Sequence, residues 1–160
     1  MIILGIDPSL NSTGYGVIKY QNSRLYYITS GVIKHSKSDE LPQKLLNISN
    51  TISDVITEFK PNKAGIEETF VNSNFQTSLK LGMARGAIFV NLAKFEVPIF
   101  EISPNLIKKN ITGYGRASKE QLSFMVSQIL SGIPNGTVFK TDDETDALSI
   151  AITTHTSHRV

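Results

Sequence analysis

The feature that most constrains this chain is an apolar run near its start that ends in an acid. The stretch 2–6 is almost entirely aliphatic, which is typical of a strand buried on both faces. Asp7 follows directly, at the point where this strand must leave the core. A buried charge costs several kcal/mol unless it is paired or binds a metal ion. Because Asp is also common in turns, this position alone leaves two interpretations open: a turn-forming acid or a functional one.

The residues after Asp7 predict an antiparallel meander. Pro8 and Ser9 turn the chain, and the stretch 14–20 returns with small or apolar residues alternating with polar ones. A polar turn at 21–23 leads into a third strand at 24–33. Three strands with such short connections indicate a meander.

The remainder of the chain alternates helical and strand patterns. Apolar residues at three- and four-residue steps predict a helix that begins near Pro42 and ends before Pro61. Further strands are predicted at 64–66 and 97–102, with a long helix at 76–95 between them. A short helix opens at 103–104, a capping box at 118–121 begins the next one, and a last helix begins at 142.

Length and composition narrow the class of protein. At 160 residues with 40% apolar content, we expect one compact domain over 1–160 with a frayed end. The absence of cysteine excludes disulfides, thiolate zinc sites and cysteine nucleophiles. The first apolar run is too short for a signal peptide or a membrane span, so the expectation is a cytoplasmic protein that does not associate with membranes.

Four acids lie at the ends of predicted elements. Asp7 and Glu67 each end a strand, and Asp143 and Asp146 share one face of the last helix because they are three residues apart. If the two strands are neighbours and the helix crosses their ends, the four carboxylates converge, and such a cluster needs cations. Oxygen ligands select Mg²⁺ or Mn²⁺. Two such ions about 3.5–4 Å apart can activate water and stabilise the leaving oxygen of a phosphodiester.

Several of these stretches, in this order, resemble the RuvC family of Holliday-junction resolvases. The stretch 4–8 reads Leu-Gly-Ile-Asp-Pro and 13–17 reads Thr-Gly-Tyr-Gly-Val. The similar stretches further along are 66–70, 79–86 and 143–151, so that the resemblance spans almost the whole chain.

The resemblance implies an α/β fold of the ribonuclease H-like type, with a five-stranded mixed sheet flanked by helices on both faces. It implies a crossover junction endodeoxyribonuclease of DNA recombination and repair, a homodimer that nicks a four-way DNA junction symmetrically. The implied cofactor is Mg²⁺, two ions per active site with Mn²⁺ as a substitute. The implied partner is a branch-migration helicase complex of the RuvA and RuvB type.

The resemblance also assigns roles to residues. Asp7, Glu67, Asp143 and Asp146 match the catalytic acids and metal ligands. Lys108 and Lys119 match two basic residues that support catalysis and contact DNA, and Phe70 matches an aromatic that stacks on junction bases. Asp142 lies beside Asp143, but the three-residue step to Asp146 favours Asp143. The family usually has glycine where this chain has Ser9, so the turn must form without it.

Basic residues are concentrated in the middle of the chain, where 72–120 carries seven against three acids. The seven are Lys80, Arg85, Lys94, Lys108, Lys109, Arg116 and Lys119. We expect DNA binding by Lys80, Arg85, Lys109 and Arg116 in addition to the matched lysines. Without the resemblance, an ordinary solvated surface would explain these charges, and a core position would explain Phe70.

Two glycines, Gly82 and Gly86, lie within the predicted long helix, although each weakens a helix by about 1 kcal/mol. They indicate a face that another backbone approaches closely, through either internal packing or a dimer contact. The histidines, His35, His155 and His158, have no metal-ligand spacing.

Three other functions are compatible with parts of the pattern. Actin-like and sugar-kinase ATPases also begin with a strand, an Asp and a glycine-bearing hairpin, but they need a second nucleotide-binding domain. A junction-binding module without chemistry would bind polyanionic DNA better without the four acids. A relative that cleaves another nucleic acid, as ribonuclease H does, remains open.

Overall fold

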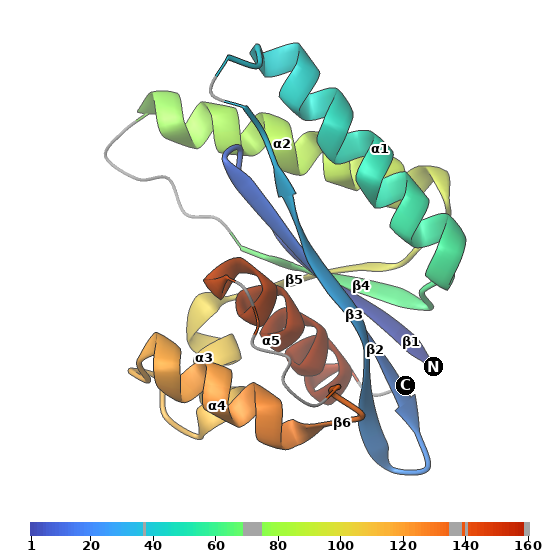
Figure 1. Ribbon diagram of the computed structural model, residues 1–160, viewed down its shortest axis with the longest axis vertical. Helices are drawn as coiled ribbons and strands as arrows, with labels where there is room; N and C mark the ends of the chain where they lie inside the picture. The colour runs from blue at the N-terminus through green and yellow to red at the C-terminus, as the bar shows by residue number, and fades with distance from the viewer. Residues whose placement is uncertain (37, 69–74, 135–138, 140, 159–160) are drawn as a thin grey trace.

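A mixed six-stranded sheet lies at the centre of the molecule in the computed structural model, which describes residues 1–36, 38–68, 75–134, 139 and 141–158 (Figure 1). The strands run in the order β5-β4-β1-β2-β3-β6. Their bounds are β1 Ile2–Asp7, β2 Ser12–Gln21, β3 Arg24–Lys34, β4 Lys63–Glu67, β5 Ile99–Ile102 and β6 Leu130–Ser131.

The first three strands pair antiparallel and form the predicted meander. The other pairs, β1 with β4, β4 with β5, and β3 with β6, are parallel. The expectation of five strands was wrong by one, because β6 adds a two-residue strand that pairs with β3. Leu130 ends the preceding helix in an extended conformation, and two residues are too few to produce a detectable strand period.

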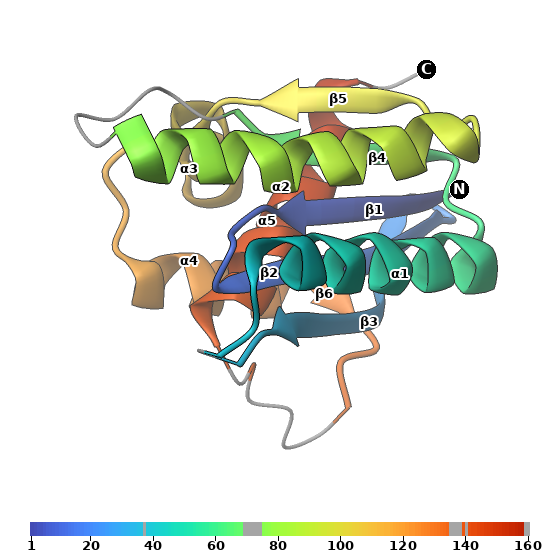
Figure 2. The same cartoon turned by 90° about the horizontal axis from the view of Figure 1, so that it is seen from above.

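Helices cover both faces of the sheet, as predicted (Figure 2). On one face lie α1 (Leu41–Phe59) and α2 (Phe75–Lys94), and on the other lie α3 (Pro104–Thr112), α4 (Lys119–Ile129) and α5 (Asp142–Ser157). Each layer encloses its own cluster of buried aliphatic side chains against the sheet. None of the helices described is both long and apolar enough to cross a membrane.

The helix boundaries follow the local signals in the sequence. Proline lies in the first turns of α1 and α3. Gly113 ends α3 in the left-handed conformation, with φ 73°, which glycine adopts without a steric cost. At α4, Ser118 and Gln121 exchange the two hydrogen bonds of a capping box, which confirms that prediction.

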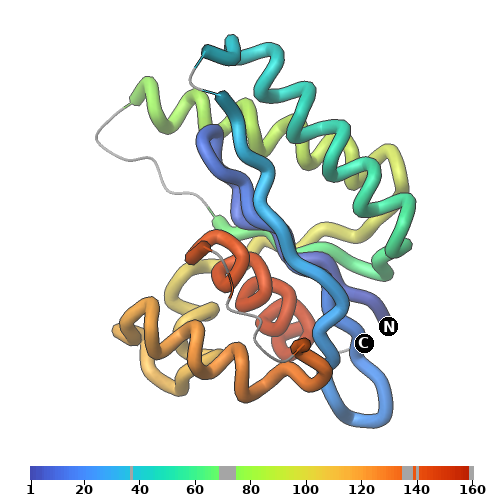
Figure 3. Tube along the Cα trace, viewed as in Figure 1, coloured from blue at the N-terminus to red at the C-terminus, as the bar shows by residue number. Residues whose placement is uncertain are grey.

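The last helix lies directly on the central strands, on the opposite side from α1 (Figure 3). A Cβ added at Gly5 of β1 would lie only 2.5 Å from the backbone nitrogen of Ala151, and one at Gly65 of β4 would lie 3.0 Å from Ile150. Only glycine permits this close approach. The close packing fixes α5 along the sheet, with its first turn at the end where β1 finishes.

Candidate active site

The strand ends and the start of α5 bring the predicted acids to one edge of the sheet. Asp7 and Glu67 end β1 and β4, two parallel neighbours whose preceding residues pair directly. Gly14, which pairs with Asp7 across the hairpin, packs so tightly on Asp143 that an added Cβ would lie 2.7 Å from its carbonyl carbon. Asp146 lies three residues further along α5, one turn beyond Asp143. The convergence predicted from the sequence therefore rests on strand register and on one helix–strand contact.

These carboxyl groups disfavour one another's charge. Burial, followed by the charges of Glu67, Asp146 and Asp143, raises the pKa of Asp7 from 3.8 to about 8. Burial, followed by the charge of Asp146, raises the pKa of Glu67. Burial also raises the pKa of Asp146, against the lowering effect of Lys119. The protein alone therefore supplies too little positive charge to the cluster, which is the condition under which carboxylates bind cations.

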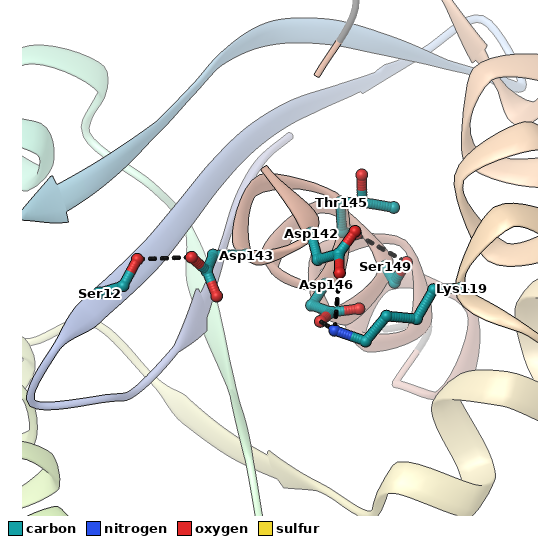
Figure 4. A network of polar contacts seen from close by, with 7 residues as sticks. All are labelled: Ser12, Lys119, Asp142, Asp143, Thr145, Asp146 and Ser149. Atoms are coloured by element: carbon teal, nitrogen blue, oxygen red, sulfur yellow. Dashed lines mark hydrogen bonds and ion pairs between the residues drawn. The ribbon is translucent and has the colours of Figure 1, made fainter. Parts of the chain in front are cut away.

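The side chains at this edge are engaged with protein partners (Figure 4). Asp143 accepts a hydrogen bond of 2.5 Å from Ser12. Lys119 lies 2.9 Å from a carboxylate oxygen of Asp142 and 3.9 Å from one of Asp146. In this arrangement, the described residues contain no group of three or more acids or histidines close enough to ligate one metal ion. The donor set itself, all carboxylate oxygens with excess negative charge, fits a hard divalent cation.

A cavity of about 180 Å³ opens beside the acids and contains both predicted lysines. Glu67 and Asp146 line one part of it, and Lys108 of α3 and Lys119 of α4 line another. The remaining lining residues are Pro104, Ile107, Ala117, Ser118 and Leu122. Acids that could hold a cation and ammonium groups that could hold a phosphate thus share one water-accessible space.

Comparison with known proteins agrees with this geometry. The family model described as "Crossover junction endodeoxyribonuclease RuvC" matches residues 3–155. The curated protein of that name from Rickettsia akari is 46% identical over 155 residues, which cover 97% of each chain. Its counterpart from Rickettsia bellii is 47% identical over 153 residues, 96% of each chain.

The chain belongs to the RuvC family.

A solved RuvC structure has the same fold. The structure of Thermus thermophilus RuvC in complex with a Holliday junction substrate superposes with a TM-score of 0.86 at 28% identity, over 96% of this chain and 92% of that one. The ribonuclease H-like fold predicted from the resemblance is therefore confirmed, with the sixth strand as the one addition.

The hairpin turn of this chain forms without the glycine that is usual in the family at position 9. Ser9 is not among the described residues with a positive φ, so the position needs no glycine here. The Ser9 backbone N–H donates to Thr13 Oγ1 at 3.2 Å, and that hydroxyl donates to the Ser9 carbonyl at 2.5 Å. The Asn11 N–H donates to Ser9 Oγ at 3.2 Å. Side-chain hydrogen bonds thus replace glycine as the means of closing this turn.

The other predicted DNA-binding residues occupy different surroundings. Lys109 and Arg116 are exposed, and Lys80 lines a separate cavity of about 290 Å³ beside the β1–β2 turn. Arg85 donates to the backbone carbonyl of Glu67 and pairs with Glu101, so its guanidinium supports the end of β4, and its DNA contact stays a prediction. Phe70 lies outside the described residues.

Sequence reasoning did not find two of the polar contacts at this site. Ser12 lies 131 positions from Asp143, and no local pattern links them. The sequence shows Asp142 only as a neighbour of Asp143, whereas in the structure its carboxylate accepts a hydrogen bond from Lys119. Both contacts depend on how α5 docks on the sheet and beside α4, which only the tertiary structure fixes.

Proposed function

We propose that this protein is a metal-dependent endonuclease that resolves four-way DNA junctions by two symmetric nicks in recombination and repair. The proposal rests on one observation. Acids from the ends of β1 and β4 and from the start of α5 lie beside a cavity that is also lined by two lysines. The activity in the family's name and the junction DNA bound to the similar T. thermophilus structure support it. A ribonuclease H-type activity on RNA–DNA hybrids is the alternative to test.

Asp7, Glu67, Asp143 and Asp146 are the residues that would hold the metal. Bound there, two Mg²⁺ ions, or Mn²⁺ as a substitute, would supply Lewis acidity and lower the pKa of a hydrolytic water. Because the pKa of Asp7 is raised to about 8, cation binding at neutral pH must displace a proton from this group. Cleavage should therefore increase with pH through the titration of the cluster.

The lysines are proposed to hold the phosphate that is cut. Lys108 is half-buried in the cavity wall, whereas the Lys119 side chain is 64% exposed. Each ammonium carries three donors and can bind phosphate oxygens as charge develops on them. Lys80, Lys109, Arg116 and, by prediction, Arg85 would contact the DNA backbone outside the cavity, which adds affinity without sequence preference. Phe70 is proposed to stack on an opened junction base near the scissile phosphate.

The second nick requires a second active site, and we propose a homodimer through α2. An exposed apolar stripe follows one face of this helix, directly opposite its buried face. It comprises Phe75, Leu79, Gly82, Met83, Gly86 and Val90. A two-fold dimer would present the same active site to two symmetry-related strands. It would act in the cytoplasm, with a branch-migration helicase complex of the RuvA and RuvB type as the family resemblance implies.

The direct test is cleavage of a synthetic four-way junction beside a linear duplex and an RNA–DNA hybrid, with and without Mg²⁺. The wild-type protein should cut only the junction, and only with Mg²⁺. Glu67→Gln should lower cleavage at least ~100-fold, because it removes a metal ligand, while junction binding in EDTA and the thermal midpoint remain close to wild type.

The matched control is Glu68→Gln, which makes the same charge change one residue beyond the strand and should keep cleavage. Wild-type cleavage rates in Glu67→Gln would contradict the assignment of the metal site. Preferential cutting of the RNA–DNA hybrid by the wild-type protein would instead favour the alternative substrate.

A further inference from the structure

A hydroxyl group on the β1–β2 hairpin holds one of the proposed metal ligands. Ser12 is the first residue of β2, and its side chain points toward Asp143 in the first turn of α5 (Figure 4). Their oxygens, Ser12 Oγ and Asp143 Oδ2, are 2.5 Å apart. An ionised carboxylate can only accept, so Ser12 donates this hydrogen bond. A bond from a neutral hydroxyl to a charged oxygen is short and strong for its type.

The hairpin fixes the backbone on both sides of Ser12. Ser12 pairs with Lys34 in the β2–β3 ladder. Thr13 is fully buried and bonded to the Ser9 carbonyl, and Asn11 donates its N–H to the Ser9 hydroxyl. Serine has a single heavy-atom torsion of its own, so aiming its hydroxyl costs little conformational entropy. The donor is therefore pre-positioned by the same bonds that close the turn without glycine.

The backbone of Asp143 is equally fixed, which leaves the direction of its carboxylate to its side-chain partners. The Asp143 carbonyl lies against Gly14 of β2 with no room for a Cβ between them. Asp142, the preceding acid, is exposed and pairs with Lys119 instead. Among the residues that the structure describes, Ser12 is the partner that holds Asp143 Oδ2, and no described hydrogen bond reaches Oδ1.

We propose that Ser12 is the positioning residue of Asp143: it fixes Oδ2 by hydrogen bond and leaves Oδ1 to the divalent cation. The inference rests on the proposed function, since it assigns Asp143 to the metal site. Carboxylate ligands are usually held by such outer hydrogen bonds, and losing one typically weakens metal binding 10–100-fold. The competing interpretation is that the bond only joins the hairpin to α5 and affects stability alone.

Calorimetric titration of the full-length protein with Mg²⁺ and Mn²⁺ separates these interpretations. Ser12→Ala should raise the metal Kd about 10-fold or more and lower junction cleavage at limiting Mg²⁺, with recovery at high Mg²⁺. Ser12→Thr, which keeps the hydroxyl on a strand residue, should return the Kd to within about 3-fold of wild type. Ser127→Ala is the control, because it removes an exposed hydroxyl that bonds within α4, to the Phe124 carbonyl, and lies outside the hairpin.

A double-mutant cycle tests whether Ser12 acts through Asp143. In an Asp143→Asn background, Ser12→Ala should cause no further change in metal Kd, because the ligand that it positions has gone. Thermal melts in EDTA report any purely structural effect of each variant.

Three results would overturn the inference. One is a wild-type Kd for Ser12→Ala, and another is a Ser12→Ala effect that persists in full with Asn at position 143. The third is a loss in Ser12→Ala that Ser12→Thr does not restore. In all three cases, the proposed function still holds if the wild-type protein binds metal and cuts junctions. A wild-type protein that does neither overturns the proposed function as well.

Discussion

Asp7 shows how the site affects stability at the scale of one residue. Its pKa is raised from 3.8 to about 8 in the folded chain, first by burial and then by the neighbouring acids. Between these pH values the folded chain binds a proton that the unfolded chain has released. The contribution to folding is therefore complete below about pH 4 and is lost as the pH rises through about 8. The metal-free fold should weaken with pH, and a bound cation should reverse that loss.

Asp7→Asn should therefore stabilise the metal-free protein at high pH. The amide resembles the neutral acid, so we expect a thermal midpoint several degrees above wild type at pH 9 in EDTA and little difference at pH 4. For a chain of this size, about 1 kcal/mol corresponds to roughly 2–4 °C. Adding Mg²⁺ at pH 9 should raise the midpoint of the wild-type protein and not that of the variant.

The control for this experiment is Asp54→Asn on the exposed side of α1. It should shift neither the midpoint nor its pH dependence. An equal gain for Asp7→Asn at both pH values would show that the charge of Asp7 is not the cause.

The sequence predicted the candidate site residues that lie at the ends of strands and at the start of a helix. It missed the contacts that depend on how α5 packs on the sheet. Asp7 and Glu67 end strands, and the step from Asp143 to Asp146 follows helical spacing, so local pattern was enough to single them out. The Ser12–Asp143 bond joins residues 131 positions apart. Such a pair becomes predictable only once the helix has been placed on the hairpin.

At the scale of elements, capping residues and prolines predicted where helices begin and end. The order of the strands depends instead on which strands pair in the folded chain. The bounds of α1 and α4 follow proline and the capping box. The short strand β6 arises because α4 ends beside the free edge of β3, a tertiary effect with no sequence period of its own.

The ion pair between α4 and α5 makes a prediction at this scale. Both side chains of the Lys119–Asp142 pair are 64% exposed, so the pair contributes at most about 1 kcal/mol to stability. Asp142 nevertheless places a negative charge on a lysine proposed to bind phosphate. Asp142→Asn should leave the thermal midpoint unchanged and tighten junction binding about 2–5-fold at low salt, by freeing Lys119.

Fluorescence anisotropy in EDTA, in a Glu67→Gln background that does not cut, measures this binding directly. The gain should shrink as salt rises, because screening weakens the interaction of exposed charges. Asp54→Asn makes the same charge change on the opposite layer and should have a smaller effect. Unchanged or weaker binding by Asp142→Asn would indicate that Lys119 does not contact DNA phosphates.

At the scale of the whole molecule, the apolar stripe on α2 is the surface of the proposed dimer. Phe75, Leu79 and Val90 have 75%, 63% and 68% of their surface exposed. A Cβ added at Gly82 or Gly86 would meet nothing within 4 Å. Internal packing, one of the two explanations for these glycines, is therefore excluded within the described part of the chain. The proposed dimer contact is the other of the two explanations.

Gly86→Leu tests this dimer without weakening the subunit. The open space around Gly86 accepts a side chain, and replacing a helical glycine raises stability by up to about 1 kcal/mol. In the proposed dimer, a leucine would nevertheless separate the two backbones that meet at this position. We expect the variant to keep or raise its thermal midpoint, to elute as a monomer in light-scattering chromatography, and to lose paired cutting of a junction while occasional single nicks persist. Asn50→Leu, an apolar substitution on the exposed face of α1, should remain dimeric and cut both strands. A Gly86→Leu protein that is still a dimer and still makes coordinated paired nicks would show that the subunits meet through another surface.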